Sequence, residues 1–120
     1  MNFLLRLIIS TLAVLISSFI LPGVHIQDNN FFIALLVAAV LAFLNAVIKP
    51  IMIVLTIPVT IVTFGLFLLV INAFMILLTD KLVDGFTVDN FWWALLFSFI
   101  LSIITSILEG LKKRDENESN

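Results

Sequence analysis

The chain has 120 residues, of which 62% are hydrophobic and 12% are charged, whereas about 25% of residues are charged in an ordinary soluble domain. So little polar surface excludes a water-soluble fold of this size, and a lipid bilayer is the expected solvent. The net charge of −2 points to no anionic partner. The absence of cysteine excludes disulfides, thiolate metal sites and cysteine nucleophiles.

Two apolar segments in the first half of the chain have the length of a membrane span. Phe3–Leu21 and Phe31–Ile48 each approach the roughly 20 residues that a helix needs to cross a bilayer. His25 and Asp28 fall in the loop between them, and Lys49 follows the second segment. We expect both segments to be transmembrane helices with little room for tilt.

The third apolar run, residues 50–78, is too long for one upright helix and contains Pro50 and Pro58. Proline removes a backbone donor and clashes with the preceding turn, so we expect the helical path to break near Thr56–Pro58. The sequence therefore predicts a short separate helix over Pro50–Leu55, followed by a third span over about Val59–Thr79.

The last apolar run, Phe91–Leu108, is the fourth predicted span. After it, residues 112–120 are polar with no apolar face, which indicates that residues 111–120 form a disordered charged tail on the cytoplasmic side. The expected fold is an all-α membrane protein with four transmembrane helices and a short extra helix before the third span. We assign residues 1–110 to a single transmembrane domain.

Positive charge predicts the orientation, because Lys and Arg near span ends are retained in the cytoplasm. If both termini are inside, five of the six Lys and Arg residues are cytoplasmic and Lys81 is outside. The five are Arg6, Lys49, Lys112, Lys113 and Arg114. A signal peptide is the rival interpretation of the first apolar run, but that run has a counterpart later in the chain.

The sequence contains an internal duplication. Leu21–Ile26 aligns with Val83–Val88, and an aromatic cluster follows each copy. We predict two tandem parallel two-helix repeats, residues 1–48 and 59–110, joined by a connector at residues 49–58 and related by an axis along the membrane normal. The aromatic clusters, expected to form an interfacial belt, are Phe31, Phe32, Phe91, Trp92 and Trp93.

The outer-loop turns contain Gly23 and Gly85, each where a helix is expected to end. Glycine there can adopt the left-handed conformation that closes a helix. Beyond each glycine, apolar and polar residues alternate, which indicates extended chain. The two extended segments either pair as a small external ribbon or remain unpaired loops whose apolar residues enter the interface.

Small residues recur every four positions along the second and fourth predicted spans. Helices in lipid associate through close backbone approach and hydrogen bonds, and small residues allow both. We expect these small-residue ladders to be helix-packing faces, either within one chain or between the copies of a homo-oligomer. The ladder residues are Ala34, Ala38, Ala42, Ala46, Ala94, Ser98, Ser102 and Ser106.

The spans have no ionisable residue at their centres, which argues against ion-coupled transport. Asn45 and Asn72 are expected to form interhelical hydrogen bonds, with a pore lining as the alternative. His25 and Asp28 lack a third ligand for a metal site, and no phosphate loop or nucleophile motif occurs. We therefore expect that the protein is not an enzyme and that it binds no cofactor, nucleic acid or small-molecule substrate. Its expected partner is the lipid bilayer.

Four segments carry a resemblance to a known family: Leu21–Val24, Leu44–Ile51, Leu55–Thr60 and Gly65–Ala73. From Phe3 to Leu108 the chain is similar to the bacterial four-span membrane proteins grouped as the phage holin superfamily IV, or YvlD-like, family. Lys49 stands where the family's arginine is expected, and Asp84 replaces the proline of the second loop. The resemblance implies a bacterial inner-membrane protein with four spans.

Two function classes follow from these features. A holin-like protein would self-associate through the small-residue ladders and open membrane lesions for a muralytic enzyme. A chromosomal envelope scaffold or regulatory membrane protein would use the same faces without any pore activity.

Overall fold

The computed structural model describes residues 2–63 and 65–118, with side chains to residue 112. Within these residues the chain is mostly helical, with one two-stranded ribbon. In chain order the elements are α1 (Phe3–Ile20), β1 (Val24–Ile26), the 3-10 turn η1 (Gln27–Asn29), α2 (Phe31–Leu55), α3 (Ile57–Val62), α4 (Phe67–Leu82), β2 (Phe86–Val88) and α5 (Phe91–Glu118).

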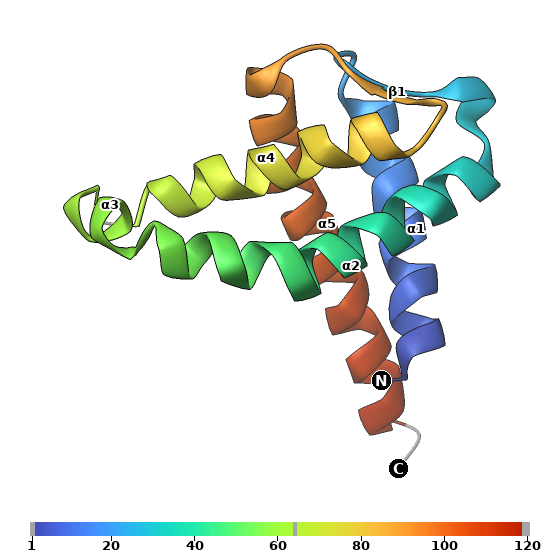
Figure 1. The fold of residues 1–120 in the computed structure, drawn as a ribbon. Helices are drawn as coiled ribbons and strands as arrows, with labels where there is room; N and C mark the ends of the chain where they lie inside the picture. Colours follow the sequence, from blue (N-terminus) through green and yellow to red (C-terminus); the bar gives the residue numbers. More distant parts are fainter. Residues whose placement is uncertain (1, 64, 119–120) are drawn as a thin grey trace.

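The long helices form two pairs that cross each other. Helix α1 packs beside α5, and α2 packs beside α4 (Figure 1). The ribbon lies over one end of α1 and α4, while the two termini lie together at the far end of the first pair and α3 lies at the far tip of the second (Figure 1). The two pairs therefore diverge away from the ribbon.

The extended segments pair, so the ribbon alternative is the one observed. Strands β1 and β2 are antiparallel, with Val24 opposite Val88 and Ile26 opposite Phe86. These apolar side chains are buried while His25 is exposed, as alternation in a strand requires. The ribbon is closed by two flanking hydrogen bonds: the Gln27 N–H donates to the Gly85 carbonyl (2.8 Å), and the Asp89 N–H donates to the Gly23 carbonyl (2.9 Å).

The two loop glycines have different roles. Gly85 has φ +94°, the left-handed conformation expected of it, but Gly23 does not adopt a positive φ. A Cβ atom at Gly23 would instead overlap the indole of Trp93. The left-handed expectation is therefore wrong for Gly23, where the absence of a side chain makes room for an aromatic ring from α5.

The predicted break near Thr56–Pro58 is confirmed, but its surroundings differ from the expectation. Helix α2 runs through Pro50 to Leu55, so the predicted separate helix at Pro50–Leu55 is wrong. Pro50 removes the N–H that would donate to the Ala46 carbonyl, four residues earlier, and Ala46 is an exposed residue of a cavity lining. Membrane helices tolerate proline where neighbouring groups or water can satisfy the freed carbonyl.

The short extra helix does occur, as α3, seven residues later than expected. Pro58 lies in its first turn, where a missing N–H costs nothing. The predicted continuous span over Val59–Thr79 is also wrong, because the chain turns between α3 and α4 at Gly65, which has φ +85°. That conformation favours glycine and ends a helix.

Helices α1, α2 and α5 are each long and apolar enough to cross a bilayer. Helix α4 has 16 residues, about 24 Å at 1.5 Å per residue, which is less than the roughly 30 Å of a hydrocarbon core. Helix α5 continues to Glu118, so residues 111–118 are helical where a disordered tail is expected. Lys, Arg and Glu are good helix formers, and no proline ends the helix; residues 119–120 lie outside the described part of the chain.

The core lies where the helix pairs cross, beneath the ribbon. Val14, Val37 and Phe97 are almost fully buried there, and the Phe97 ring packs against Phe86 of β2 with centroids 5.8 Å apart. Asparagine caps fix where α2 and α5 begin: Asn30 accepts from the Phe32 N–H (2.7 Å) and Asn90 from the Trp93 N–H (3.1 Å). The core and caps thus hold one end of the molecule together.

Candidate functional site

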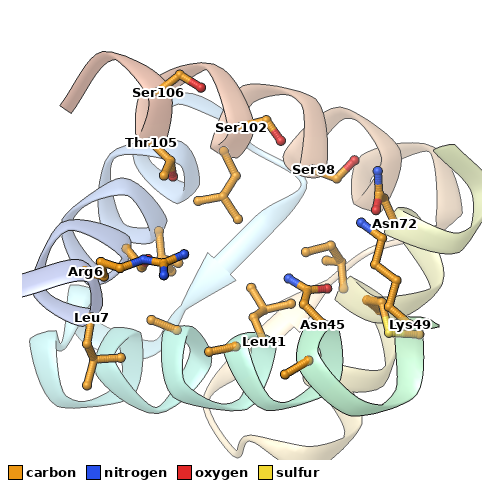
Figure 2. Close-up of a pocket in the computed structure, with 18 of the residues that line it drawn as sticks. Arg6, Leu7, Leu41, Asn45, Lys49, Asn72, Ser98, Ser102, Thr105 and Ser106 are labelled. Atoms are coloured by element: carbon orange, nitrogen blue, oxygen red, sulfur yellow. The ribbon is translucent and has the colours of Figure 1, made fainter. Parts of the chain in front are cut away.

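A cavity of about 670 Å³ lies between the diverging helix pairs, on the side of the core away from the ribbon. All four long helices contribute to its walls, and Figure 2 shows their side chains directed into it. Its apolar lining residues are Phe3, Leu7, Val14, Leu41, Met75, Ile76 and Leu101, together with alanines of α2.

The small-residue ladders run from the core into this cavity. Ala34 and Ala94 are fully buried, and Ala38 and Ser98 are 3% and 9% exposed. The remaining ladder positions are exposed on the cavity wall: Ala42, Ala46, Ser102 and Ser106. The structure therefore places both ladders along one cavity of a single chain, with one half of each in or beside the core and the other half exposed on the cavity wall.

Both asparagines lie on the cavity wall, Asn45 on α2 and Asn72 on α4. Within the described residues, neither amide makes a side-chain hydrogen bond to a neighbouring helix of the kind expected from the sequence. Ser10 of α1 and Thr105 of α5 complete the neutral polar lining. A mostly apolar chain thus gathers polar side chains from all four long helices at one place.

Two cations also line the cavity. Arg6 reaches into it from α1, and Lys49 extends from α2 toward Asn72 (Figure 2). Up to residue 112, where the described side chains end, no Asp or Glu lines the cavity. The sequence alone does not reveal this pair, because Arg6 and Lys49 each lie near a membrane boundary and are far apart along the chain. A signal existed: Ala42, Asn45 and Lys49 are spaced three and four residues apart, so they share one face of a helix.

The lining residues correspond between the two halves of the chain. On α2 and α5 they are 60 positions apart: Ala38 and Ser98, Leu41 and Leu101, Ala42 and Ser102, Asn45 and Thr105, Ala46 and Ser106. On α1 and α4 they are 62 positions apart: Ser10 and Asn72, Val14 and Ile76. The second half carries the more polar member at most of these positions.

The outer surface offers a weaker candidate. His25 contacts Asp89, with 3.1 Å between His25 Nε2 and Asp89 Oδ1, and not Asp28, the partner considered from the sequence. Both side chains are about half exposed. No group of three potential metal ligands occurs among residues 2–63 and 65–112. The His25–Asp89 contact is therefore a link across the ribbon.

The aromatic residues expected at the interface follow the ribbon. Phe32 and Trp92 are largely exposed, at 62% and 70%, and Phe31 is half exposed. Phe91 meets Trp92 edge to face, with centroids 5.5 Å apart. Trp93 differs, because it packs over Gly23.

Comparison with known proteins gives a family match over nearly the whole chain. Residues 1–107 match the family described as mycobacterial 4 TMS phage holin, superfamily IV. An uncharacterised membrane protein of Bacillus subtilis, YvlD, is 35% identical over 114 residues, covering 90% of this chain and 94% of that protein. An uncharacterised protein of Streptomyces coelicolor is 39% identical over 117 residues, covering 91% and 94%. No solved structure matches the chain.

Proposed function

The chain belongs to the phage holin superfamily IV, and from that premise we propose that it is a holin-like protein that permeabilises the cytoplasmic membrane through the cavity between its helix pairs. The observation that carries this proposal is the cavity itself. A chain with 62% hydrophobic residues lines one space of about 670 Å³ with hydroxyls, amides and two cations.

In a bilayer, the polar lining of this cavity would lie at membrane depth. Polar and charged side chains at membrane depth are costly unless they face a bundle interior or a water-filled space. The exposed halves of the ladders, together with Asn45 and Asn72, satisfy this requirement if water fills the cavity. The proposed activity is therefore passage of water and small solutes along this wall, without catalysis.

The proposed topology has both termini in the cytoplasm and the ribbon outside. Arg6, Lys49 and Lys112 then lie toward the cytoplasm, and Lys81 next to the ribbon lies outside, in keeping with the distribution of cations around membrane spans. Helices α3 and α4 together form the third of four crossings in chain order, with α3 in the cytoplasmic leaflet. The cavity then opens toward the cytoplasm, because the helix pairs diverge away from the ribbon.

The proposal includes a two-fold repeat, α1–α2 and α4–α5, about an axis along the membrane normal. Its support is the antiparallel ribbon, whose flanking hydrogen bonds join Gln27 to Gly85 and Asp89 to Gly23, and the corresponding spacing of the lining residues. In this repeat, α1–α2 and α4–α5 supply equivalent walls on the two sides of the cavity.

The test is regulated expression in bacteria with a membrane-potential dye, with and without a co-expressed endolysin. We expect depolarisation after induction, and lysis when the endolysin is present, because a water-filled path dissipates the ion gradient. Unchanged membrane potential at an expression level confirmed by immunoblot would contradict the proposal.

A second candidate function is an envelope scaffold without pore activity. The observation that favours it is the exposed half of each ladder, which leaves Ala42 and Ser102 free to take a helix from another copy at close range. In the same cells, cross-linked oligomers without depolarisation would support the scaffold. Depolarisation by a chain that forms no cross-linked oligomers would support the cavity of the single chain.

A further inference from the structure

Among the residues whose side chains are described, both charges that line the cavity are positive. Arg6 and Lys49 both face it, and neither has a carboxylate within the 4.0 Å of an ion pair among the residues whose side chains are described. The acidic residues of the outer side, such as Asp80 and Asp89, lie at or beside the ribbon. Glu109 follows Ser106 by three positions on α5 but does not line the cavity.

The neutral lining suits an oxygen-rich anion. Hydroxyls of Ser10, Ser102 and Ser106 and the amides of Asn45 and Asn72 can each donate to an acceptor oxygen. Arginine binds phosphate through two parallel N–H groups, and lysine acts on it as a point charge. The walls of one cavity therefore carry two cations and several neutral donors, the groups that bind phosphate.

The apolar part of the lining indicates that the ligand also has an apolar portion. Leu7, Leu41 and Leu101 lie on the same walls as the polar groups, and Val14 and Ile76 lie at the buried end. A volume of about 670 Å³ is far larger than a simple anion needs and lies within the range of roughly 300–1,000 Å³ of organic ligand sites. An anionic amphiphile satisfies the charged and the apolar parts together.

We propose that the cavity binds an anionic phospholipid, with its headgroup attracted by Arg6 and Lys49 from opposite walls (Figure 2) and part of its acyl chains against the leucines. Basic recesses between membrane helices on the cytoplasmic side are suited to such headgroups. The inference goes beyond the proposed function. It shares with it the cytoplasmic opening of the cavity, but a bound lipid would displace water from the cavity, so the lipid-bound state is distinct from the water-filled state and does not require that the protein permeabilise the membrane.

The test uses the full chain purified in neutral detergent and follows thermal unfolding as phosphatidylglycerol is titrated. Phosphatidylcholine with the same acyl chains is the matched zwitterionic probe, and inorganic phosphate is the soluble one. We expect phosphatidylglycerol to raise the melting temperature, and phosphatidylcholine and inorganic phosphate to have little effect. Arg6→Gln and Lys49→Gln should each weaken the apparent affinity about fivefold, since each removes one positive charge that faces the anionic headgroup.

Lys112→Gln is the control, because Lys112 belongs to the same proposed cytoplasmic group of cations but does not line the cavity. It should leave the affinity unchanged. Equal stabilisation by phosphatidylglycerol and phosphatidylcholine would overturn the proposed site. So would a loss of affinity in Lys112→Gln equal to that in the cavity variants, because the lipid effect would then come from the general surface charge. Stabilisation by inorganic phosphate alone would overturn the lipid and indicate a soluble phosphate compound. Lipid binding by a protein that causes no depolarisation would refute the proposed function and leave this site intact.

Discussion

Ser102→Phe is expected to abolish depolarisation while leaving the protein folded. Ser102 lies on the cavity wall at an exposed position, so a benzyl group there occupies cavity space without displacing core side chains. Substitutions at exposed positions usually change stability by no more than about 0.5 kcal/mol. The variant should therefore keep its melting temperature in detergent and lose the dye response, which would return to the level of uninduced cells.

The matched control is Ile103→Phe on the same helix. Ile103 is 46% exposed and is not a lining residue, so its side chain lies on the surface that faces lipid in the proposed arrangement. Lipid accepts either side chain, and depolarisation should persist. If Ser102→Phe still depolarises the membrane, the cavity is not the route. Ala38→Phe should behave differently from both, because Ala38 is 3% exposed and overpacking there costs about 1–3 kcal/mol.

Gly23→Ala is expected to destabilise the protein by about 1–3 kcal/mol, the usual cost of overpacking. Its new Cβ atom would overlap the Trp93 ring, so either the turn before β1 or the start of α5 must shift. Gly110→Ala is the control, because no atom lies within 4 Å of a Cβ at that position. Since alanine is the better helix former, Gly110→Ala should be neutral or stabilising by up to about 1 kcal/mol.

Chemical unfolding of both variants in detergent, followed by far-ultraviolet circular dichroism, measures the difference. Trp93→Ala supplies the double-mutant cycle: removing the ring should remove most of the cost of Gly23→Ala. An additive cycle, or equal effects at Gly23 and Gly110, would show that the contact between Gly23 and Trp93 does not control the turn.

The sequence predicts most of the helices because length and hydropathy determine them. The starts of α2 and α5 follow Asn30 and Asn90, and the break between α2 and α3 falls where Pro58 requires it. The ribbon was foreseeable as one of two alternatives, because alternation indicates a strand but does not say whether a partner strand is in reach.

The errors concern backbone effects that composition does not reveal. Pro50 lies inside α2, and Ala46, whose carbonyl loses its donor, borders a cavity whose position depends on where the other helices lie. Gly65 divides the predicted third span because one residue with a left-handed conformation outweighs an apolar run. Gly23 is required by Trp93, a residue 70 positions later in the chain.

The candidate site could be predicted only in parts. The spacing of the small residues predicts the ladders, because a helix places every third or fourth residue on one face, whereas Asn45 and Asn72 stand out only as amides within apolar spans. Their meeting with Arg6, Asn72 and Lys49 depends on the crossing of the two helix pairs. No local sequence pattern determines that crossing. In the sequence alone, the polar residues that line the cavity therefore look unrelated to one another.

Thiol labelling in intact cells and in inverted membrane vesicles tests most directly whether the cavity is a water-filled space open to the cytoplasm. The chain has no cysteine, so single cysteines at His25, Ser102 and Ile103 report without background. A membrane-impermeant maleimide should label position 25 in intact cells, position 102 in inverted vesicles, and position 103 in neither. Labelling of 103 as fast as 102, or failure to label 102 from either side, would contradict the account.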